Sequence, residues 1–321
     1  MRLLLALLSV RAVAPADVAV CFAGQIRSSL RNNRLKSTIS KWSGLGTVDF
    51  FLAVDFEETA PTNNHGGCAA THDPRAVLDL FRPQPKSYRF WNGTASIASS
   101  PHGGVDIEPP ASCKRPVDWT SSSVLCMGDF GGEAGCMDDA CTHCDITRYM
   151  FLPHARTHAC LRDVVAEEGR RGFPYRYVVA TRPDFKFKSE APRFKHGVPP
   201  IATWDARFAA DRVYAWDAGR AFASDPFFLF RRELLTTFLT VRNTFEKCQS
   251  RAKNIGMGLR NDSTWPRWYF PEGVMVVALR KHGVGVETIY RRHDHMIDRA
   301  GCEPSLRLER AREAVAPVDD S

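Results

Sequence analysis

The run Tyr-Val-Val-Ala-Thr at 177–181 stops abruptly at Arg182, Pro183 and Asp184. Strands that are buried on both faces of a parallel sheet have continuous apolar sequences, and charged side chains are placed where such a strand leaves the core. Proline ends the pairing of a strand because it has no N–H group to donate. The pattern therefore predicts a buried strand of an α/β sheet that opens at its carboxyl end onto a polar site.

Two earlier runs have the same form. Each is apolar, apart from Asp49 in the second, and then gives way to polar residues, at 18–23 before Gly24, Gln25 and Arg27, and at 48–54 before Asp55. Ligands of open α/β sheets bind outside the carboxyl ends of the strands. We therefore expect these polar residues to converge with Arg182 and Asp184 on one crevice.

Helical patterns alternate with the apolar runs. Leu35, Ile39 and Trp42 recur at helical spacing, and 145–172 has a helical distribution of apolar residues that Pro153 is expected to kink or divide. Alternating strands and helices predict the α/β class, with a mostly parallel central sheet flanked by helices.

The chain of 321 residues suits a single domain with one interruption. We expect this domain at 17–305, with a Cys-rich loop insertion at about 92–144 that is rich in Gly, Ser and Pro, and a C-terminal tail at 306–321. The formal charge of +7 is spread along the chain without a basic stripe interleaved with aromatic residues. Nucleic acid is therefore not an expected partner, whereas small phosphorylated ligands are.

Residues 1–16 have the features of a signal peptide: Arg2, an apolar stretch at 3–10 and small residues at 12–16. An N-terminal strand or helix of the fold is the alternative. The apolar stretch is too short to cross a bilayer, so no transmembrane span is predicted.

Ten cysteines and the glycosylation sequons at Asn92 and Asn261 fit the same oxidising compartment. We expect a glycoprotein with disulfide bonds, either secreted or in the lumen of the Golgi or ER. Disulfides are favoured over a zinc site, although one group of residues has ligand chemistry suited to zinc: Cys136, Cys141, His143, Cys144, His154, His158 and Cys160.

Arg182 and Asp184 suggest the chemistry of the crevice. A carboxylate can hold a hard divalent cation, and a guanidinium can bind phosphate oxygens with two parallel hydrogen bonds. Together they suit a diphosphate with its metal ion. The alternative is an ion pair between Arg182 and Asp184 that only fixes a loop.

Short motifs add a resemblance. Cys-x-x-Gly-Gln-x-Arg begins at Cys21, Arg-Pro-Asp stands at 182–184, and Ser-Asp and Pro-Glu open later segments. In these motifs the chain resembles a group of poorly characterised eukaryotic and viral glycosyltransferase-like proteins of GT-A type. The segments that carry the resemblance are 18–30, 160–187, 211–217, 224–238 and 271–286.

The resemblance implies a nucleotide-diphospho-sugar as donor substrate, with Mn²⁺ or Mg²⁺ as the divalent metal. By position Asp184 would hold the metal, although Arg-Pro-Asp stands here without an Asp-x-Asp pair. The residues expected to bind the nucleotide and its diphosphate are Gly24, Gln25, Arg27, Asp55 and Arg182.

Three further residues complete the predicted site. Asp225 and Glu272 are candidates for acceptor binding or for the catalytic base, and Glu272 has the alternative role of interacting with the N-terminus of its own helix. His293 is a second candidate metal ligand, with a solvated loop histidine as the alternative.

The sequence thus predicts a glycosyltransferase that moves a sugar from a nucleotide-diphospho-sugar to a hydroxyl of a glycan or glycoprotein acceptor. Two other classes stay open. One is a catalytically inactive secreted carbohydrate-binding protein on the same scaffold, since a fold does not fix a function. The other is a zinc hydrolase built on the Cys/His region.

Overall fold

The computed structural model describes residues 16–26, 34–45, 48–56, 73–93, 95–100, 106–107, 148–183, 185, 199–215, 227–246, 275–276 and 279–289. These residues form an eight-stranded sheet in the order β4-β3-β2-β1-β5-β7-β6-β8. The strands are β1 Val18–Gln25, β2 Val48–Asp55, β3 Ser87–Asn92, β4 Ala95–Ser100, β5 Tyr177–Thr181, β6 Arg212–Ala215, β7 Phe227–Arg231 and β8 Gly285–Thr288.

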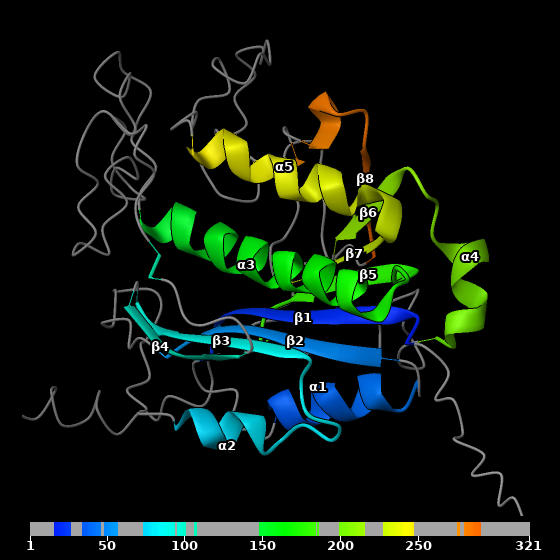
Figure 1. The fold of residues 1–321 in the computed structure, drawn as a ribbon. Coiled ribbons are helices and arrows are strands. Elements are labelled where there is room, and N and C mark those ends of the chain that lie inside the picture. The colour runs from blue at the N-terminus through cyan, green and yellow to red at the C-terminus, as the bar shows by residue number, and fades with distance from the viewer. Residues whose placement is uncertain are drawn as a thin grey trace, which may run out of the picture.

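Helices cover both faces of this sheet (Figure 1). Helices α3 and α5 lie over one face, and α1 and α2 lie over the other. Among the described residues, the helical elements with both ends defined are α1 Arg34–Ser43, α2 Pro74–Leu78, α3 Arg148–Arg171, the 3₁₀ turn η3 Ile201–Thr203, α4 Trp204–Arg207, the 3₁₀ turn η4 Arg232–Leu234 and α5 Leu235–Glu246. The expected α/β class, with flanking helices, is confirmed.

Strand β1 is the centre of the fold. Its side chains alternate between the two faces, so Ala19, Cys21 and Ala23 pack towards α3, while residues such as Val20 and Phe22 pack towards α1. All but Ala23, at 5% exposure, are 0% exposed. Burial on both faces explains why this run is continuously apolar in sequence.

The sheet is mostly parallel but mixed. Strands β1 and β2, β1 and β5, β2 and β3, and β6 and β8 are parallel. Strand β7 runs antiparallel to both β5 and β6, and β4 runs antiparallel to β3. Strand β4 lies at the start of the predicted insertion, where we expected a loop; the rest of that stretch lies outside the described residues, apart from 106–107.

Helix α1 forms as its sequence predicts, with Leu35, Ile39 and Trp42 all buried. Helix α3 continues from Arg148 to Arg171, so Pro153 does not divide it, and a kink at Pro153 stays a prediction. The first four N–H groups of a helix have no partner within it, and proline is tolerated best there. Pro153 is the sixth residue of α3, so its missing N–H group removes one hydrogen bond within the helix.

Candidate functional site

The order of the strands reverses at β1. The chain passes from β1 outward through β2 and β3, and then returns to the other side of β1 to form β5. Helices α1 and α2, which precede β3, lie on one face of the sheet, and α3, which leads into β5, lies on the other (Figure 1). Such a reversal marks the place where ligands bind in open α/β sheets, at the carboxyl ends of the strands.

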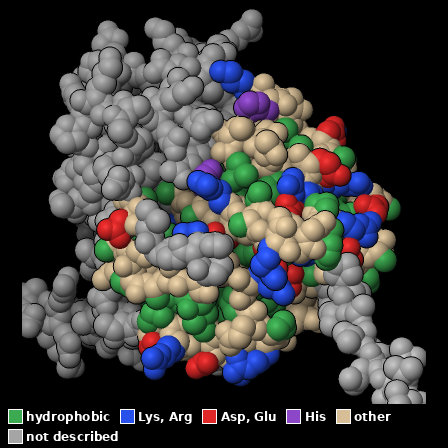
Figure 2. Space-filling view, in the orientation of Figure 1, with side chains coloured by type: hydrophobic (Ala, Val, Ile, Leu, Met, Phe, Trp, Pro, Cys, Tyr) green, Lys and Arg blue, Asp and Glu red, His purple; other side chains and the backbone are tan. Residues whose placement is uncertain are grey.

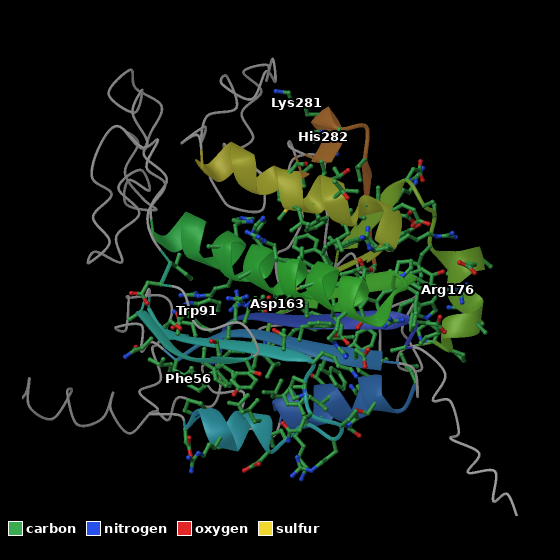
Figure 3. The ribbon with its side chains drawn as sticks, viewed as in Figure 1. Phe56, Trp91, Asp163, Arg176, Lys281 and His282 are labelled. Atoms are coloured by element: carbon green, nitrogen blue, oxygen red, sulfur yellow. A yellow bond between two sulfur atoms is a disulfide. The ribbon has the colours of Figure 1, made fainter. Side chains whose placement is uncertain are left out.

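We call this end of the sheet the carboxyl edge; it contains the last residues of β1, β2, β3 and β5, which are Gln25, Asp55, Asn92 and Thr181. The opposite end, where these strands begin, is the amino edge. Figure 3 shows Phe56 and Trp91 towards the carboxyl edge and Arg176 at the amino edge.

Gly24 and Arg182 meet at the carboxyl edge. A Cβ atom added to Gly24 would lie 3.5 Å from Cγ of Arg182 and 3.8 Å from Cδ of Pro183. Gly24 also has φ +129°, a conformation that side chains disfavour, so a residue other than glycine would strain the backbone here. The structure therefore brings two of the predicted nucleotide-site residues into contact, with Arg182 partly exposed.

Strand β5 ends where the sequence predicted, at Thr181. Pairing with β1 and β7 stops at Thr181, and the N–H of Phe185 donates to the carbonyl of Arg182 over 3.1 Å. A bond over three residues marks a turn, so strand alternation does not extend past Thr181.

Asp55 occupies the same edge but is fully buried, with 0% exposure. One carboxylate oxygen, Oδ1, accepts from the N–H of Gly93 over 2.9 Å, and Oδ2 forms an ion pair with Nη2 of Arg156. A carboxylate enclosed in this way contacts protein groups rather than a ligand in solvent. The structure thus gives Asp55 a role inside the fold, and its nucleotide contact stays a prediction.

Arg156 is a residue that the sequence interpretation missed. It extends from α3, is 2% exposed, and also donates from Nη2 to the carbonyl of Gly93 over 3.3 Å. A signal was present, because Arg156 precedes Cys160 and Val164 at intervals of four and so lies on the apolar stripe of its helix. A charge in such a stripe indicates a buried partner.

Five predicted site residues lie outside the described part of the chain: Arg27, Asp184, Asp225, Glu272 and His293. Gln25 is described and pairs in register with Asp55. Within the described ranges, no group of three or more His, Cys, Asp or Glu residues is placed to hold a metal ion. Both predicted metal ligands, Asp184 and His293, belong to the undescribed set.

Cys160 forms a disulfide with Cys21, joining α3 to β1 with the Cα atoms 6.0 Å apart. For these two residues the preference for disulfides is confirmed, and Cys160 is removed from the alternative set of zinc ligands. The other cysteines of that set, Cys136, Cys141 and Cys144, lie outside the described residues.

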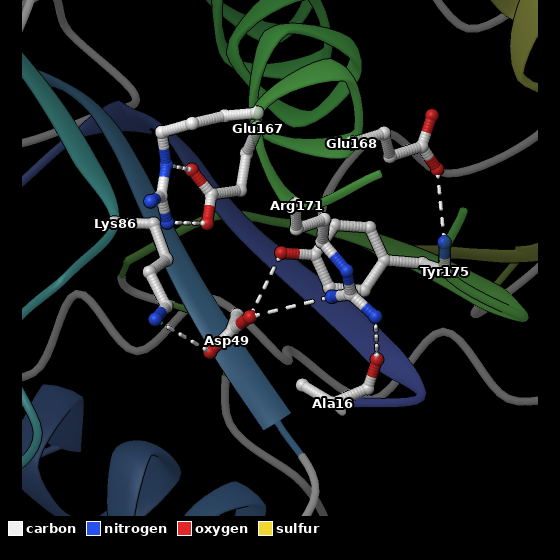
Figure 4. A network of polar contacts seen from close by, with 8 residues as sticks. Ala16, Asp49, Lys86, Glu167, Glu168, Arg171 and Tyr175 are labelled. Atoms are coloured by element: carbon white, nitrogen blue, oxygen red, sulfur yellow. Dashed lines mark hydrogen bonds and ion pairs between the residues drawn. The ribbon is translucent and has the colours of Figure 1, made fainter. Parts of the chain in front are cut away.

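The amino edge carries a second polar network (Figure 4). The hydroxyl of Tyr175 donates to Oδ2 of Asp49 over 2.8 Å, while Arg171 pairs with the same oxygen at 3.5 Å and donates to the carbonyl of Ala16. Lys86 approaches Oδ1 of Asp49 at 3.6 Å. Burial and the carboxylate of Asp49 raise the pKa of Tyr175, so this phenol stays protonated. These contacts tie the last residue of α3 to the start of β2.

The chain matches no protein-family model, and it matches no curated protein either. The described helices include none that is both long and apolar enough to cross a membrane.

Proposed function

We propose that this protein is a glycosyltransferase of GT-A-like fold that transfers a sugar from a nucleotide-diphospho-sugar to a hydroxyl of a glycan or glycoprotein. The observation that carries the proposal is the contact of Gly24 with Arg182 at the carboxyl ends of β1 and β5. This is the reversal point of the sheet, where a doubly wound fold takes its nucleotide ligand.

The roles follow from the chemistry of each side chain. Arg182 binds diphosphate oxygens, and the glycine at position 24 leaves room for the Arg182 side chain to lie against the end of β1. Gln25 and Arg27 complete the nucleotide pocket. Asp184 and His293 would hold Mn²⁺ or Mg²⁺, and such an ion would supply positive charge for the leaving diphosphate. Asp225 or Glu272 binds or deprotonates the acceptor hydroxyl.

The direction of α3 supports an anionic ligand at this edge. Arg156, early in α3, pairs with Asp55 at the end of β2, while Arg171, its last residue, pairs with Asp49 near the start of β2. Helix α3 therefore runs antiparallel to β2, with its amino-terminal half at the carboxyl edge. The positive end of a helix dipole favours negative charge nearby.

The proposal places the protein in the secretory pathway, in the Golgi or ER lumen or outside the cell. Two structural observations support this compartment. Cys21 and Cys160 form a disulfide, and Asn92 of the first sequon is exposed at the end of β3. Disulfides persist in oxidising compartments, and an exposed sequon is open to glycosylation.

The decisive experiment measures hydrolysis of a panel of nucleotide-sugars by the full chain, with and without Mn²⁺. Compared with wild type, Asp184→Asn and Arg182→Lys should each lower turnover of the preferred donor at least about 100-fold, because charge on the leaving diphosphate is no longer neutralised. Arg176→Lys, an exposed arginine at the amino edge, is the matched control and should retain activity. Turnover that survives in Asp184→Asn refutes the metal assignment.

The second candidate is a carbohydrate-binding protein without catalysis, and calorimetry separates it from the first. Metal-dependent binding of a nucleotide-sugar supports the transferase. Binding of a glycan with no response to any nucleotide-sugar or nucleoside diphosphate would replace it with the binding protein.

A further inference from the structure

We propose that Arg156 is a positioning residue: through its buried ion pair with Asp55 it fixes the backbone of the carboxyl edge beside the ligand site. The effect on catalysis rests on the proposed function. The effect on the backbone does not, and the two can be measured separately.

The pair joins three separate elements at one point. Arg156 comes from α3, Asp55 is the last residue of β2, and Gly93 lies in the turn between β3 and β4. Asp55 accepts from the N–H of Gly93 over 2.9 Å, and Arg156 donates to the carbonyl of the same glycine over 3.3 Å. Both backbone polar groups of Gly93, whose φ is +68°, are therefore held by one ion pair.

The same pair reaches the end of β1. Gln25 is the register partner of Asp55, and the N–H of Ile26 donates to the carbonyl of Asp55 over 3.0 Å. Neighbouring strands lie about 5 Å apart, so a shift of Asp55 is transmitted directly to Gln25 and Ile26 at the end of β1. These residues follow Gly24, which contacts Arg182 where the ligand is proposed to bind.

A gain in folding stability does not by itself explain the presence of a buried ion pair. Removing two charges from water costs as much as their attraction returns, and apolar replacements of a buried pair are often as stable. Arg156 and Asp55 are 2% and 0% exposed, so this cost applies in full. An apolar pair would make no hydrogen bonds to Gly93. The ion pair makes them, and so it fixes the position of the turn between β3 and β4.

The molecule offers a matched control in the ion pair of Arg89 with Asp163. It also links α3 to the sheet, with Nη2 of Arg89 at 2.7 Å from Oδ1 of Asp163 and Nε at 2.8 Å from Oδ2. Asp163 additionally accepts from the hydroxyl of Ser87, the first residue of β3. Ser87 and Arg89 pair in register with Phe51 and Ala53 of β2, so this ion pair lies over the middle of the sheet and does not contact Gly93 at the carboxyl edge.

The experiment compares two double variants of the full chain with wild type. Asp55→Asn with Arg156→Met removes both charges at the carboxyl edge and keeps an oxygen for the N–H of Gly93. Asp163→Asn with Arg89→Met makes the same change at the control pair. Removing both charges together avoids leaving one of them buried and unpaired. Arg156→Lys keeps the charge but loses the planar fork, and serves as the conservative variant.

Residue-resolved amide exchange is the first readout and needs no substrate. The amides of Gly93 and Ile26 should exchange at least about tenfold faster in the Asp55/Arg156 variant than in wild type and stay unchanged in the control variant. In Arg156→Lys, the exchange rates of these two amides should lie between those of wild type and those of the Asp55/Arg156 variant. If these two amides exchanged at the same rate in wild type and both double variants, the inference would be overturned. It would also be overturned if the amides of α3 accelerated as much as those of Gly93 and Ile26, because this would indicate loosening of the helix alone.

Steady-state kinetics with the preferred nucleotide-sugar are the second readout. The Asp55/Arg156 variant should raise KM about tenfold, equivalent to about 1.4 kcal/mol, and change kcat less, as expected for a misplaced binding surface. An unchanged KM in an active variant contradicts the inference. A wild-type chain that turns over no donor refutes the proposed function instead, and the exchange data then still decide the role of Arg156.

Discussion

The charged residues at the amino edge of the sheet form a network that includes aromatic rings. At the amino edge, Asp49 accepts a hydrogen bond from the hydroxyl of Tyr175 and forms an ion pair with Arg171. The guanidinium carbon Cζ of Arg171 lies 4.0 Å from the ring centroids of both Phe173 and Tyr175. Stacking on aromatic rings and pairing with a carboxylate both favour a fixed arginine. The network therefore holds the end of α3 against the start of β2. The titration of Tyr175 tests that role.

Tyr175 makes stability depend on alkaline pH. Burial and then Asp49 raise its pKa above the ordinary value of 10.0, so the folded state holds this proton more tightly than the unfolded chain. The stabilisation is complete below pH about 10 and is lost as pH rises towards the folded-state pKa. Denaturant unfolding of wild type between pH 8 and about 11.5 should show stability falling above about pH 10.

Tyr175→Phe removes this titration and one hydrogen bond to a charged acceptor. The variant should be about 1–2 kcal/mol less stable at pH 8 and should lose less stability above pH 10 than wild type does. Some alkaline loss will remain, because burial and Asp205 also raise the pKa of Tyr177. An identical pH slope in wild type and variant would show that Tyr175 ionises no differently in the folded state.

At the scale of elements, apolar periodicity was sufficient for strands and helices that bury a whole face. It predicted β1, β2 and β5, and it predicted α1 from three buried residues. It missed β4, whose sequence Ala-Ser-Ile-Ala-Ser-Ser is exposed or half-buried throughout and contains no apolar run. That segment is a strand because it pairs with β3, an interaction between segments that no local pattern encodes.

The disulfide between Cys21 and Cys160 links α3 to β1 across 139 residues of sequence. Closing a loop of this length restricts the unfolded chain strongly, so the chain-entropy relation gives a stabilisation of about 5 kcal/mol. The double variant Cys21→Ala with Cys160→Ala should be less stable by about 3–5 kcal/mol in urea unfolding. Wild type unfolded with reductant should match the variant; a variant as stable as oxidised wild type would contradict the expected effect.

At the scale of the whole molecule, the sequence predicted which residues end strands but not which strands are neighbours. Gly24 and Arg182 meet because β5 returns to the side of β1 that β2 leaves free. The contact of Arg156 with Asp55 further needs a definite register of α3 against β2, and the apolar stripe around Arg156 indicates a buried partner without naming it. Tertiary arrangement, rather than local propensity, determines both contacts.

The same arrangement predicts a gradient of local stability across the sheet. Strand β1 is paired on both sides and buried on both faces, whereas β4 pairs with β3 alone among the described strands and Ile97 in it is 47% exposed. Amides of buried central strands exchange through global unfolding, and those of exposed edges through local opening. We therefore expect β4 to exchange at least about 100-fold faster than β1.

Hydrogen exchange in low concentrations of denaturant tests the gradient. Exchange of β1 and β5 should accelerate with added denaturant, because global unfolding exposes a large surface, while exchange of β4 should barely respond. If β4 responded as steeply as β1 and with the same protection, the sheet would open as one unit. The carboxyl edge would then have no separately mobile border at the β3–β4 turn, and Gly93 would be held by the cooperativity of the sheet instead of by Asp55 and Arg156.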